Sequence, residues 1–279
     1  MKNFSFEFFP PNTEVGAQKL SQIHADLAAL GPEFFSVTFG AGGATREKTL
    51  STVASLLATG SDVAPHVSCI GSTGESIRQL VDGYLGLGVK RIVALRGDMP
   101  SGMGFGSTGE FRYASELVAF LRKHYGDTLH IEVAAYPEAH PQAKSAKADL
   151  NAFIEKVRAG ADSAITQYFF NADAYLHFRD QVAASGEDIP IVPGIMPITN
   201  YAQLSRFSDT CGAEIPRWVR QRLVDFGDDL ESLRAFGHEV VLKLCETLIK
   251  EGAPSLHFYT LNQALPTTQL VNGIRPLVG

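Results

Sequence analysis

The chain of 279 residues has few cysteines, no cluster of basic residues and no long apolar run. Its three cysteines, Cys69, Cys211 and Cys245, are too few and too scattered for a disulfide framework or a CxxC metal site. With a net charge of −6 and no clustered lysine and arginine, nucleic acid is not an expected partner. No signal peptide is recognisable, and no apolar run approaches the roughly 18–20 residues that span a bilayer. We therefore expect a cytoplasmic protein without a membrane segment.

Several signatures of catalysis are also missing. The eight histidines show no HxH or HExxH spacing, so no metal site is expected. There is no G-x-S-x-G nucleophile elbow, and no predicted strand carries a lysine near its end for Schiff-base chemistry. Pro10-Pro11-Asn12 follows the first predicted strand, where a dinucleotide-binding open sheet would have G-x-G-x-x-G.

Strand-like and helix-like stretches alternate along the whole chain. With 45% apolar residues, the chain can bury a large core. Helical faces repeat at i, i+3 and i+4, as in Leu20, Ile23 and Leu27, and Ser72 to Glu75 resembles a capping box. Eight strands are predicted, at residues 3–8, 34–39, 63–70, 91–96, 129–135, 163–169, 190–195 and 256–261.

This order predicts an α/β fold, a (β/α)₈ TIM barrel that forms a single domain over residues 1–279. Eight strands, most followed by a helix, match the ~250 residues typical of that fold. Residues 200–251 contain more helix than one crossover needs, so extra helices are expected before the last strand, which a short helix follows. A doubly wound open sheet is the alternative, and it usually has fewer strands.

One face of several predicted strands is unusually polar. Ser5 and Glu7 alternate with phenylalanines, and His66 and Ser68 share a face. An unpaired buried carboxylate is costly, so we expect these side chains to line a site at the C-terminal mouth, where barrel enzymes work. They could also be structural groups bonded to one another, and both interpretations stay open for Glu132. The set also includes Ser36, Thr38, Arg96, Asp98, Tyr136 and Gln167.

Eight segments at or near the predicted strand ends resemble, in this order, the methylenetetrahydrofolate reductases of bacteria. The likeness covers roughly residues 4–263 and is thinnest between about 208 and 250. The segments are Ser5-Phe-Glu-Phe-Phe-Pro-Pro11, Ser36-Val-Thr-Phe-Gly-Ala41, Ala64-Pro-His-Val-Ser-Cys69, Ile92-Val-Ala-Leu-Arg-Gly-Asp98, Ala134-Ala-Tyr-Pro-Glu-Ala-His-Pro141, Ile165-Thr-Gln-Tyr-Phe-Phe170, Ile191-Val-Pro-Gly-Ile-Met-Pro197 and His257-Phe-Tyr-Thr-Leu-Asn262.

The resemblance implies a barrel that binds FAD without a Rossmann motif. It implies ping-pong transfer of a hydride from NADH or NADPH through the flavin to 5,10-methylenetetrahydrofolate. The product, 5-methyltetrahydrofolate, supplies methyl groups for methionine synthesis, and the family suggests a homo-oligomer. The alternatives are a flavin-free pterin-binding barrel methyltransferase or synthase, and a non-catalytic flavin- or folate-binding barrel.

The resemblance also implies roles for individual residues. Glu7 matches the general acid, and a raised pKa is expected for it. Asp98 matches a catalytic carboxylate near flavin and pterin. Gln167, Gln203 and Phe207 match residues that bind the substrate. The implied FAD contacts are Thr38, Phe39, Ala41, His66, Arg96, Gly97, Asp98, Tyr113, Ala114, Tyr136, His140, Ala143, Asp149 and Lys156.

The chain departs from the family pattern in three places. Gln263 stands where the family has an arginine, which puts the anchoring of the anionic folate tail in doubt. Ala152 and Glu155 replace an expected asparagine and arginine, with Asn151 and Lys156 as possible substitutes on the FAD side. The Gly-rich stretch 101–110 looks longer than usual and is a candidate flap beside Asp98.

Overall fold

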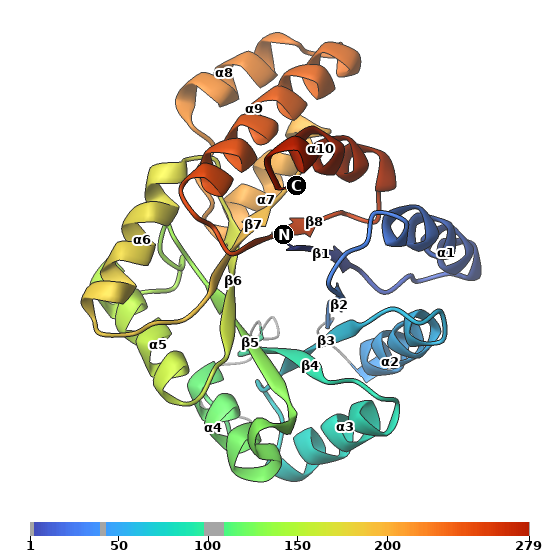
Figure 1. Ribbon diagram of the computed structural model, residues 1–279, viewed down its shortest axis with the longest axis vertical. Helices are drawn as coiled ribbons and strands as arrows, with labels where there is room; N and C mark the ends of the chain where they lie inside the picture. Colours follow the sequence, from blue (N-terminus) through green and yellow to red (C-terminus); the bar gives the residue numbers. More distant parts are fainter. Residues whose placement is uncertain (1–2, 40–42, 98–108, 279) are drawn as a thin grey trace.

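Eight parallel strands form a closed barrel in the computed structural model, which describes residues 3–39, 43–97 and 109–278. Each strand pairs with the next along the chain, and β8 pairs back with β1. Figure 1 shows the helices arranged as a ring around these strands. The predicted TIM barrel is therefore confirmed. The strands are β1 Asn3–Phe8, β2 Phe35–Val37, β3 Val63–Ser68, β4 Arg91–Leu95, β5 His130–Ala135, β6 Ser163–Tyr168, β7 Ile191–Ile195 and β8 Ser255–Tyr259.

The helices follow the strands as expected, with additions before β8. Three helices, α7 to α9, occupy the connection from β7 to β8, as the sequence predicted. The last helix has 15 residues, so the prediction of a short helix there was wrong. The helices are α1 Glu14–Ala28, α2 Gly43–Leu57, α3 Gly74–Gly86, α4 Ala114–Tyr125, the 3-10 turn η1 Gly126–Thr128, α5 Ala146–Arg158, α6 Ala172–Ala184, α7 Tyr201–Cys211, α8 Arg217–Asp225, α9 Leu230–Lys250 and α10 Ala264–Val278.

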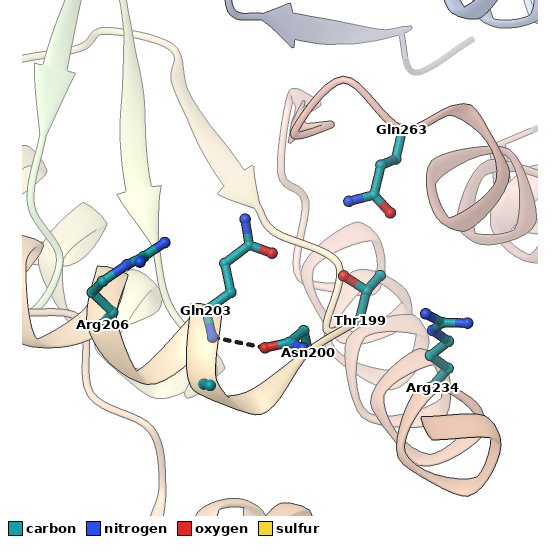
Figure 2. Close-up of a pocket in the computed structure, with 7 residues that line it drawn as sticks. Thr199, Asn200, Gln203, Arg206, Arg234 and Gln263 are labelled. Atoms are coloured by element: carbon teal, nitrogen blue, oxygen red, sulfur yellow. Dashed lines mark hydrogen bonds between the residues drawn. The ribbon is translucent and has the colours of Figure 1, made fainter. Parts of the chain in front are cut away.

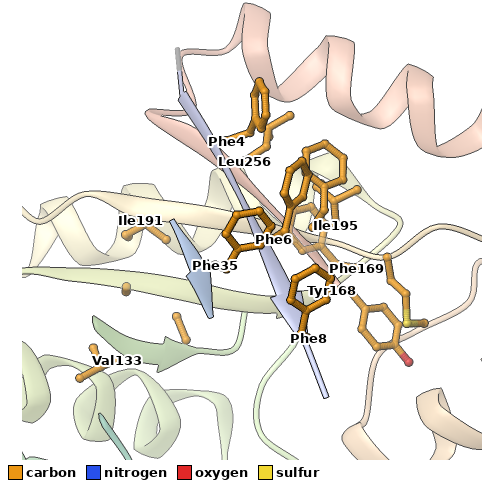
Figure 3. Packing of buried hydrophobic residues seen from close by; sticks show 14 of the residues in the cluster. Phe4, Phe6, Phe8, Phe35, Val133, Tyr168, Phe169, Ile191, Ile195 and Leu256 are labelled. Atoms are coloured by element: carbon orange, nitrogen blue, oxygen red, sulfur yellow. The ribbon is translucent and has the colours of Figure 1, made fainter. Parts of the chain in front are cut away.

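Strand β1 shows how alternation builds the core. Phe4, Phe6 and Phe8 are buried in the main hydrophobic cluster, seen in Figure 3. The ring of Phe6 lies 5.7 Å from that of Phe35 and 6.0 Å from that of Phe258, which ties β1 to both neighbouring strands. Burial of each such ring contributes roughly 1.5–3 kcal/mol. The opposite face of β1 is left for Ser5 and Glu7.

Several strand bounds differ from the sequence prediction by one or two residues, and so does the start of α3. Strand β2 has three residues, although Thr38 N still donates to the Phe8 carbonyl at 3.0 Å. Helix α3 begins one residue later than expected: Thr73 is its N-cap, and its side chain accepts from Ser76 N while Ser76 Oγ accepts from Thr73 N. Glu75 instead accepts a hydrogen bond from Gln79. The capping box therefore uses Thr73 and Ser76 rather than Ser72 and Glu75.

Within the described residues, no helix is both long and apolar enough to cross a membrane.

Candidate active site

Glu7 lies near the C-terminal end of β1, where it is 7% exposed and contacted by two imidazoles. His66 Nε2, from β3, lies 3.3 Å from Glu7 Oε2, and His257 Nε2, from β8, lies 3.9 Å from the same oxygen. Ser5 Oγ lies 2.7 Å from His257 Nδ1, and Ser36 Oγ lies 3.3 Å from His257 Nε2. The imidazole of His257, from β8, is thus held against the Glu7 carboxylate by hydroxyl groups from β1 and β2. We call Glu7, His66, His257, Ser5 and Ser36 the mouth cluster.

The pKa of Glu7 contradicts the expectation of a raised value. Burial raises the pKa of this carboxyl, but hydrogen bonds from His257 and His66, together with their charges, lower it to about 2. The two histidines outweigh burial because both act on one carboxylate within the barrel. Glu7 is therefore ionised at neutral pH in the arrangement described here.

The next polar group lies where β4 ends. Arg96 is half-buried, and its guanidinium donates to Gln142 Oε1 at 2.6 Å. Its carbonyl accepts from Ser68 Oγ at 3.0 Å, across the end of β3. Gly97 turns the chain here with φ +84°, and a Cβ at this position would lie 1.8 Å from Ser68 Oγ. Only glycine can make this turn so close to the Ser68 side chain.

An aromatic pair follows β5. The rings of Tyr136 and His140 meet edge to face with centroids 4.6 Å apart. Asp149, from the first turn of α5, accepts from His140 N at 3.0 Å and fixes this loop to the helix. Lys156 points inward from α5 and donates to the Ala134 carbonyl, and burial lowers the pKa of its ammonium to about 8.

The other expected cofactor residues that the structure describes lie around the same end of the barrel. Thr38 directly follows β2. The Arg46 guanidinium lies over the Phe39 ring, with its Cζ atom 5.8 Å from the ring centroid. Tyr113 is 57% exposed and immediately precedes Ala114, the first residue of α4. Ala143 N donates to the His140 carbonyl. Ala41, Asp98 and most of the 101–110 stretch lie outside the described residues.

Gln167 lies at an irregularity between β6 and β7. The regular pairing shifts between Ile165 and Tyr168, and Gly194 N donates to the Thr166 side chain at 2.8 Å instead. Tyr259 from β8 crosses this gap, with its hydroxyl 2.6 Å from the Thr166 carbonyl. A Cβ on Gly194 would lie 2.6 Å from the Tyr259 ring, so the crossing requires glycine. The half-buried Gln167 follows directly, with its Oε1 accepting from Tyr168 N.

A cavity of about 380 Å³ lies beside α7, and Figure 2 shows its lining. Gln203 and Gln263, both expected to bind substrate, line this cavity together. Phe207 is a half-buried residue of α7 beneath the Arg206 guanidinium and is not among the lining residues. The complete lining is Thr199, Asn200, Ala202, Gln203, Arg206, Arg234 and Gln263.

Comparison with known proteins identifies the family. A family model described as methylenetetrahydrofolate reductase matches residues 1–274. The 5,10-methylenetetrahydrofolate reductase of Escherichia coli K12 is 42% identical over 277 residues, which cover 98% of this chain and 92% of that protein. The chain belongs to the methylenetetrahydrofolate reductase family. Methylenetetrahydrofolate reductase (NADH) 1 of Arabidopsis thaliana is 37% identical, over 93% of this chain and 46% of that longer protein.

Solved structures with the same fold are more distant from this member of the methylenetetrahydrofolate reductase family. A Clostridium thermocellum protein that binds two copies of 5-methyl-5,6,7,8-tetrahydrofolic acid matches with a TM-score of 0.67 at 15% identity, covering 99% of this chain and 95% of that one. Dihydropteroate synthase of Thermus thermophilus matches with a TM-score of 0.51 at 13% identity, covering 100% and 94%. At such identities the likeness shows the barrel fold alone.

Membership in this reductase family does not place every polar strand residue at the mouth. Glu132 is 1% exposed and accepts from Ser163 Oγ at 2.6 Å and from Arg91 Nη1 at 2.5 Å. His130 Nε2 lies 3.2 Å from the same carboxylate. These partners are the first residues of β4, β5 and β6, so Glu132 lies toward the opposite end of the barrel. Its structural interpretation, and not the mouth interpretation, is the correct one.

Three residues gain importance that the sequence did not give them. From the sequence, His257 had no role beyond its place in a segment that resembles the family, although its spacing from Tyr259 on the last strand puts both on one face. Arg234 lies in the region of about residues 208–250, where the resemblance is thinnest, and Arg206 lies just before this region. No sequence motif identified either arginine, although both line the cavity. Among the described residues, no cluster of three or more His, Cys, Asp or Glu side chains could hold a metal ion.

Proposed function

We propose that this chain, over residues 1–279, is one catalytic domain that reduces 5,10-methylenetetrahydrofolate to 5-methyltetrahydrofolate with FAD and NADH or NADPH. Family membership supports the reduction of methylenetetrahydrofolate. The observation that carries the proposal is the buried Glu7 carboxylate, held by His66 and His257 at the mouth of the barrel. We further propose that the product supplies methyl groups for methionine synthesis and that the enzyme is a homo-oligomer.

Glu7 would act as the acid that prepares the folate. The methylene group of the substrate bridges two nitrogens, and a proton from Glu7 to one of them breaks a carbon–nitrogen bond. The resulting iminium ion is a better hydride acceptor, and Glu7 is left as a carboxylate.

Glu7 must be protonated for this step, although His257 and His66 lower its pKa to about 2 in the structure. A ligand that excludes water and takes over the hydrogen bond of His66 would remove one of these donors. Burial then becomes the stronger influence and raises the pKa.

The residues near the ends of β4 and β5 fit a flavin nucleotide. Tyr136 and His140 offer aromatic surface, and Arg96 offers a guanidinium beside them. When bound, FAD would supply a two-electron carrier between the nicotinamide and the folate. Asp98, two residues after Arg96 in the sequence, is proposed to bind the pterin and to tune the flavin. The proposed FAD contacts also include His66, Gly97, Thr38, Phe39, Ala41, Tyr113, Ala114, Ala143, Asp149 and Lys156.

Residues on the opposite side of the barrel would bind the two ligands in turn. Gln167, at the β6 irregularity, is proposed to bond both the folate and the nicotinamide. Phe207 would stack on either ligand, and Gln203, one helical turn before it, would contact the folate. A shared binding site for both ligands gives ping-pong kinetics.

The colour of the purified protein tests this proposal. Flavin absorption near ~450 nm should be bleached by NADH or NADPH without oxygen, and should return when methylenetetrahydrofolate is added. Anaerobic stopped-flow with each nucleotide measures both half-reactions and their nucleotide preference. A colourless protein that FAD cannot reconstitute would refute the proposal and favour a flavin-free pterin enzyme.

A further inference from the structure

Two buried hydroxyl groups join α7 to the end of β6. Tyr168, the last residue of β6, is 5% exposed, and Ser208, from α7, is 3% exposed. Tyr168 Oη lies 3.1 Å from Ser208 Oγ, within hydrogen-bond distance. Cys211, one turn later on α7, donates from its Sγ to the same tyrosine oxygen over 3.4 Å. Figure 3 shows Tyr168 among the buried residues of the main hydrophobic cluster, so these polar groups meet inside apolar packing.

The hydrogen bond fixes a property of α7 that apolar packing sets less closely. Leu204, one turn before Ser208, is 2% exposed and packs in the core. Apolar contact is non-directional, so it holds the helix against the barrel without closely setting its rotation. A hydrogen bond weakens steeply as its distance and angle change. The bond between Tyr168 and Ser208 therefore sets the rotation of α7 about its axis.

This bond does not titrate in the physiological range. Burial and the hydrogen bond from Cys211 raise the pKa of Tyr168 well above its usual range. The phenol therefore keeps its proton, and the hydroxyl of Ser208 has no charge to gain or lose near neutral pH. Any pH dependence of the folate step must then come from other groups.

The two bonded residues directly follow residues that are proposed to hold the ligands. Tyr168 follows Gln167 on β6. Ser208 follows Phe207 on α7. The regular pairing of β6 with β7 is interrupted between Ile165 and Tyr168, so the position of Gln167 depends strongly on the contacts of its neighbour. The bond is therefore a short connection between Gln167 and Phe207.

The C-terminal end of α7 has a second attachment to the barrel. Glu138, from the loop after β5, accepts from Glu214 N at 2.7 Å, just beyond the helix. A Cβ on Gly212 would lie 2.7 Å from Pro141 Cγ, so the same loop packs closely against the helix end. Loss of one hydroxyl at β6 should therefore loosen α7 without detaching it from the barrel.

Stacking on a ligand is sensitive to small shifts of the helix. Dispersion between two flat groups falls steeply with distance, and a gap of roughly 0.5–1 Å removes about a quarter to a half of it. The Phe207 ring is carried by α7, so a change in the rotation of the helix moves this ring relative to a ligand at Gln167. Folate and nicotinamide are proposed to use this position in turn, so such a shift weakens the binding of both.

We infer that Tyr168 and Ser208 are positioning residues, whose hydrogen bond holds α7 at the rotation that Phe207 needs to stack on a bound ligand. The inference rests on the proposed function, because the folate and the nicotinamide are taken from it. Both hydroxyls are buried and act through Phe207 rather than on the ligand itself.

The variants Y168F and S208A each remove one side of the bond, and anaerobic stopped-flow measures the effect on each half-reaction. In both variants the Kd of the nicotinamide nucleotide and that of methylenetetrahydrofolate, taken from the concentration dependence of the rates, should rise about fivefold, with near-unchanged limiting rates. The double variant Y168F/S208A should show no larger rise than either single variant, because the two hydroxyls form one bond. The pH profile of the folate half-reaction should not move.

The matched control is Y175F. Tyr175, from α6, is fully buried, and its hydroxyl donates to the Ile191 carbonyl at the start of β7 over 2.8 Å. Y175F should lower the melting temperature about as much as Y168F does, but it should leave both Kd values unchanged. A purely structural role for Tyr168 predicts the same behaviour in the two variants.

The outcomes separate this inference from the proposed function. Unchanged Kd values in Y168F and S208A would overturn the inference, as would a rise confined to one ligand or additive rises in the double variant. Calorimetric binding of 5-methyltetrahydrofolate provides a second readout that needs no turnover. A protein without reductase activity that bound this folate about fivefold more weakly in Y168F and S208A, but not in Y175F, would refute the proposed function and keep the inference.

Discussion

The barrel contains two buried glutamates on inward-facing positions, and their partners differ. Glu132 binds Arg91, a permanent cation, which also forms a 2.6 Å ion pair with Glu33 and lies over the Phe34 ring. Glu7 is instead paired with two imidazoles among the described residues, those of His66 and His257. The pKa of each carboxyl is lowered despite burial, in Glu132 by hydrogen bonds from His130 and Ser163 and by the charge of Arg91.

This difference separates a structural carboxylate from one that can exchange a proton. An arginine does not give up its proton, so Glu132 keeps one cation beside it over the whole physiological range. The pKa of Glu7 is instead lowered by two imidazoles, so a ligand or a substitution that displaces His66 or His257 raises this pKa. The position in the barrel agrees with this division, because the active sites of barrel enzymes lie at the C-terminal ends of the strands.

The largest effect should come from Glu132→Gln. The substitution leaves Arg91 beside an uncharged amide, with only Glu33 as a counter-ion. We expect a loss of about 3 kcal/mol in the free energy of unfolding, at the lower end for a broken buried pair because the Arg91 side chain is 25% exposed. Urea denaturation measures this loss. Glu33→Gln, on the exposed side of the same arginine, is the control and should cost less than about 1 kcal/mol.

Activity per folded molecule should change little in Glu132→Gln. A selective loss of the folate half-reaction in this variant would place Glu132 in the catalytic machinery and remove the contrast between the two glutamates.

Glu7→Gln should give the complementary result. Reduction of the folate should fall at least ~10²-fold, as is typical when a general acid is lost. Bleaching of the flavin by NADH should proceed at a near-normal rate, because that half-reaction needs no proton from Glu7. Anaerobic stopped-flow separates the two rates. If both half-reactions fell together, Glu7 would have a structural role, as Glu132 does.

The sequence was sufficient to predict the barrel because its signal is repeated eight times. Alternation in segments such as Phe4 to Phe8 predicted which side chains face the helices and which face inward, and the structure agrees. The same alternation could not separate Glu7 from Glu132. Both lie on inward faces, and the distinction depends on the position along the strand and on partners from neighbouring strands.

The pKa of Glu7 was out of reach for the same reason. Its partners are 59 and 250 residues away in the sequence, and their distances depend on the register of β1 with β8 and on the closure of the barrel. Arg206 and Arg234 were missed because they lie on two helices of the long β7–β8 connection, where no regular pattern predicts which faces meet.

The smallest expected effect is a shift in a pH profile caused by His257→Asn, and it tests the mouth cluster most directly. His257 lowers the pKa of Glu7, so its removal should raise that pKa. The folate half-reaction requires protonated Glu7, so its rate falls as the pH rises through the apparent pKa, and this fall should move upward by about one pH unit. Single-turnover reoxidation of the flavin by methylenetetrahydrofolate, measured across pH, tests this. Ser5→Ala, which removes only the hydroxyl at His257 Nδ1, should move the profile in the same direction by less. An unmoved profile in both variants would show that His257 only fills space, and that His66 alone sets the proton on Glu7.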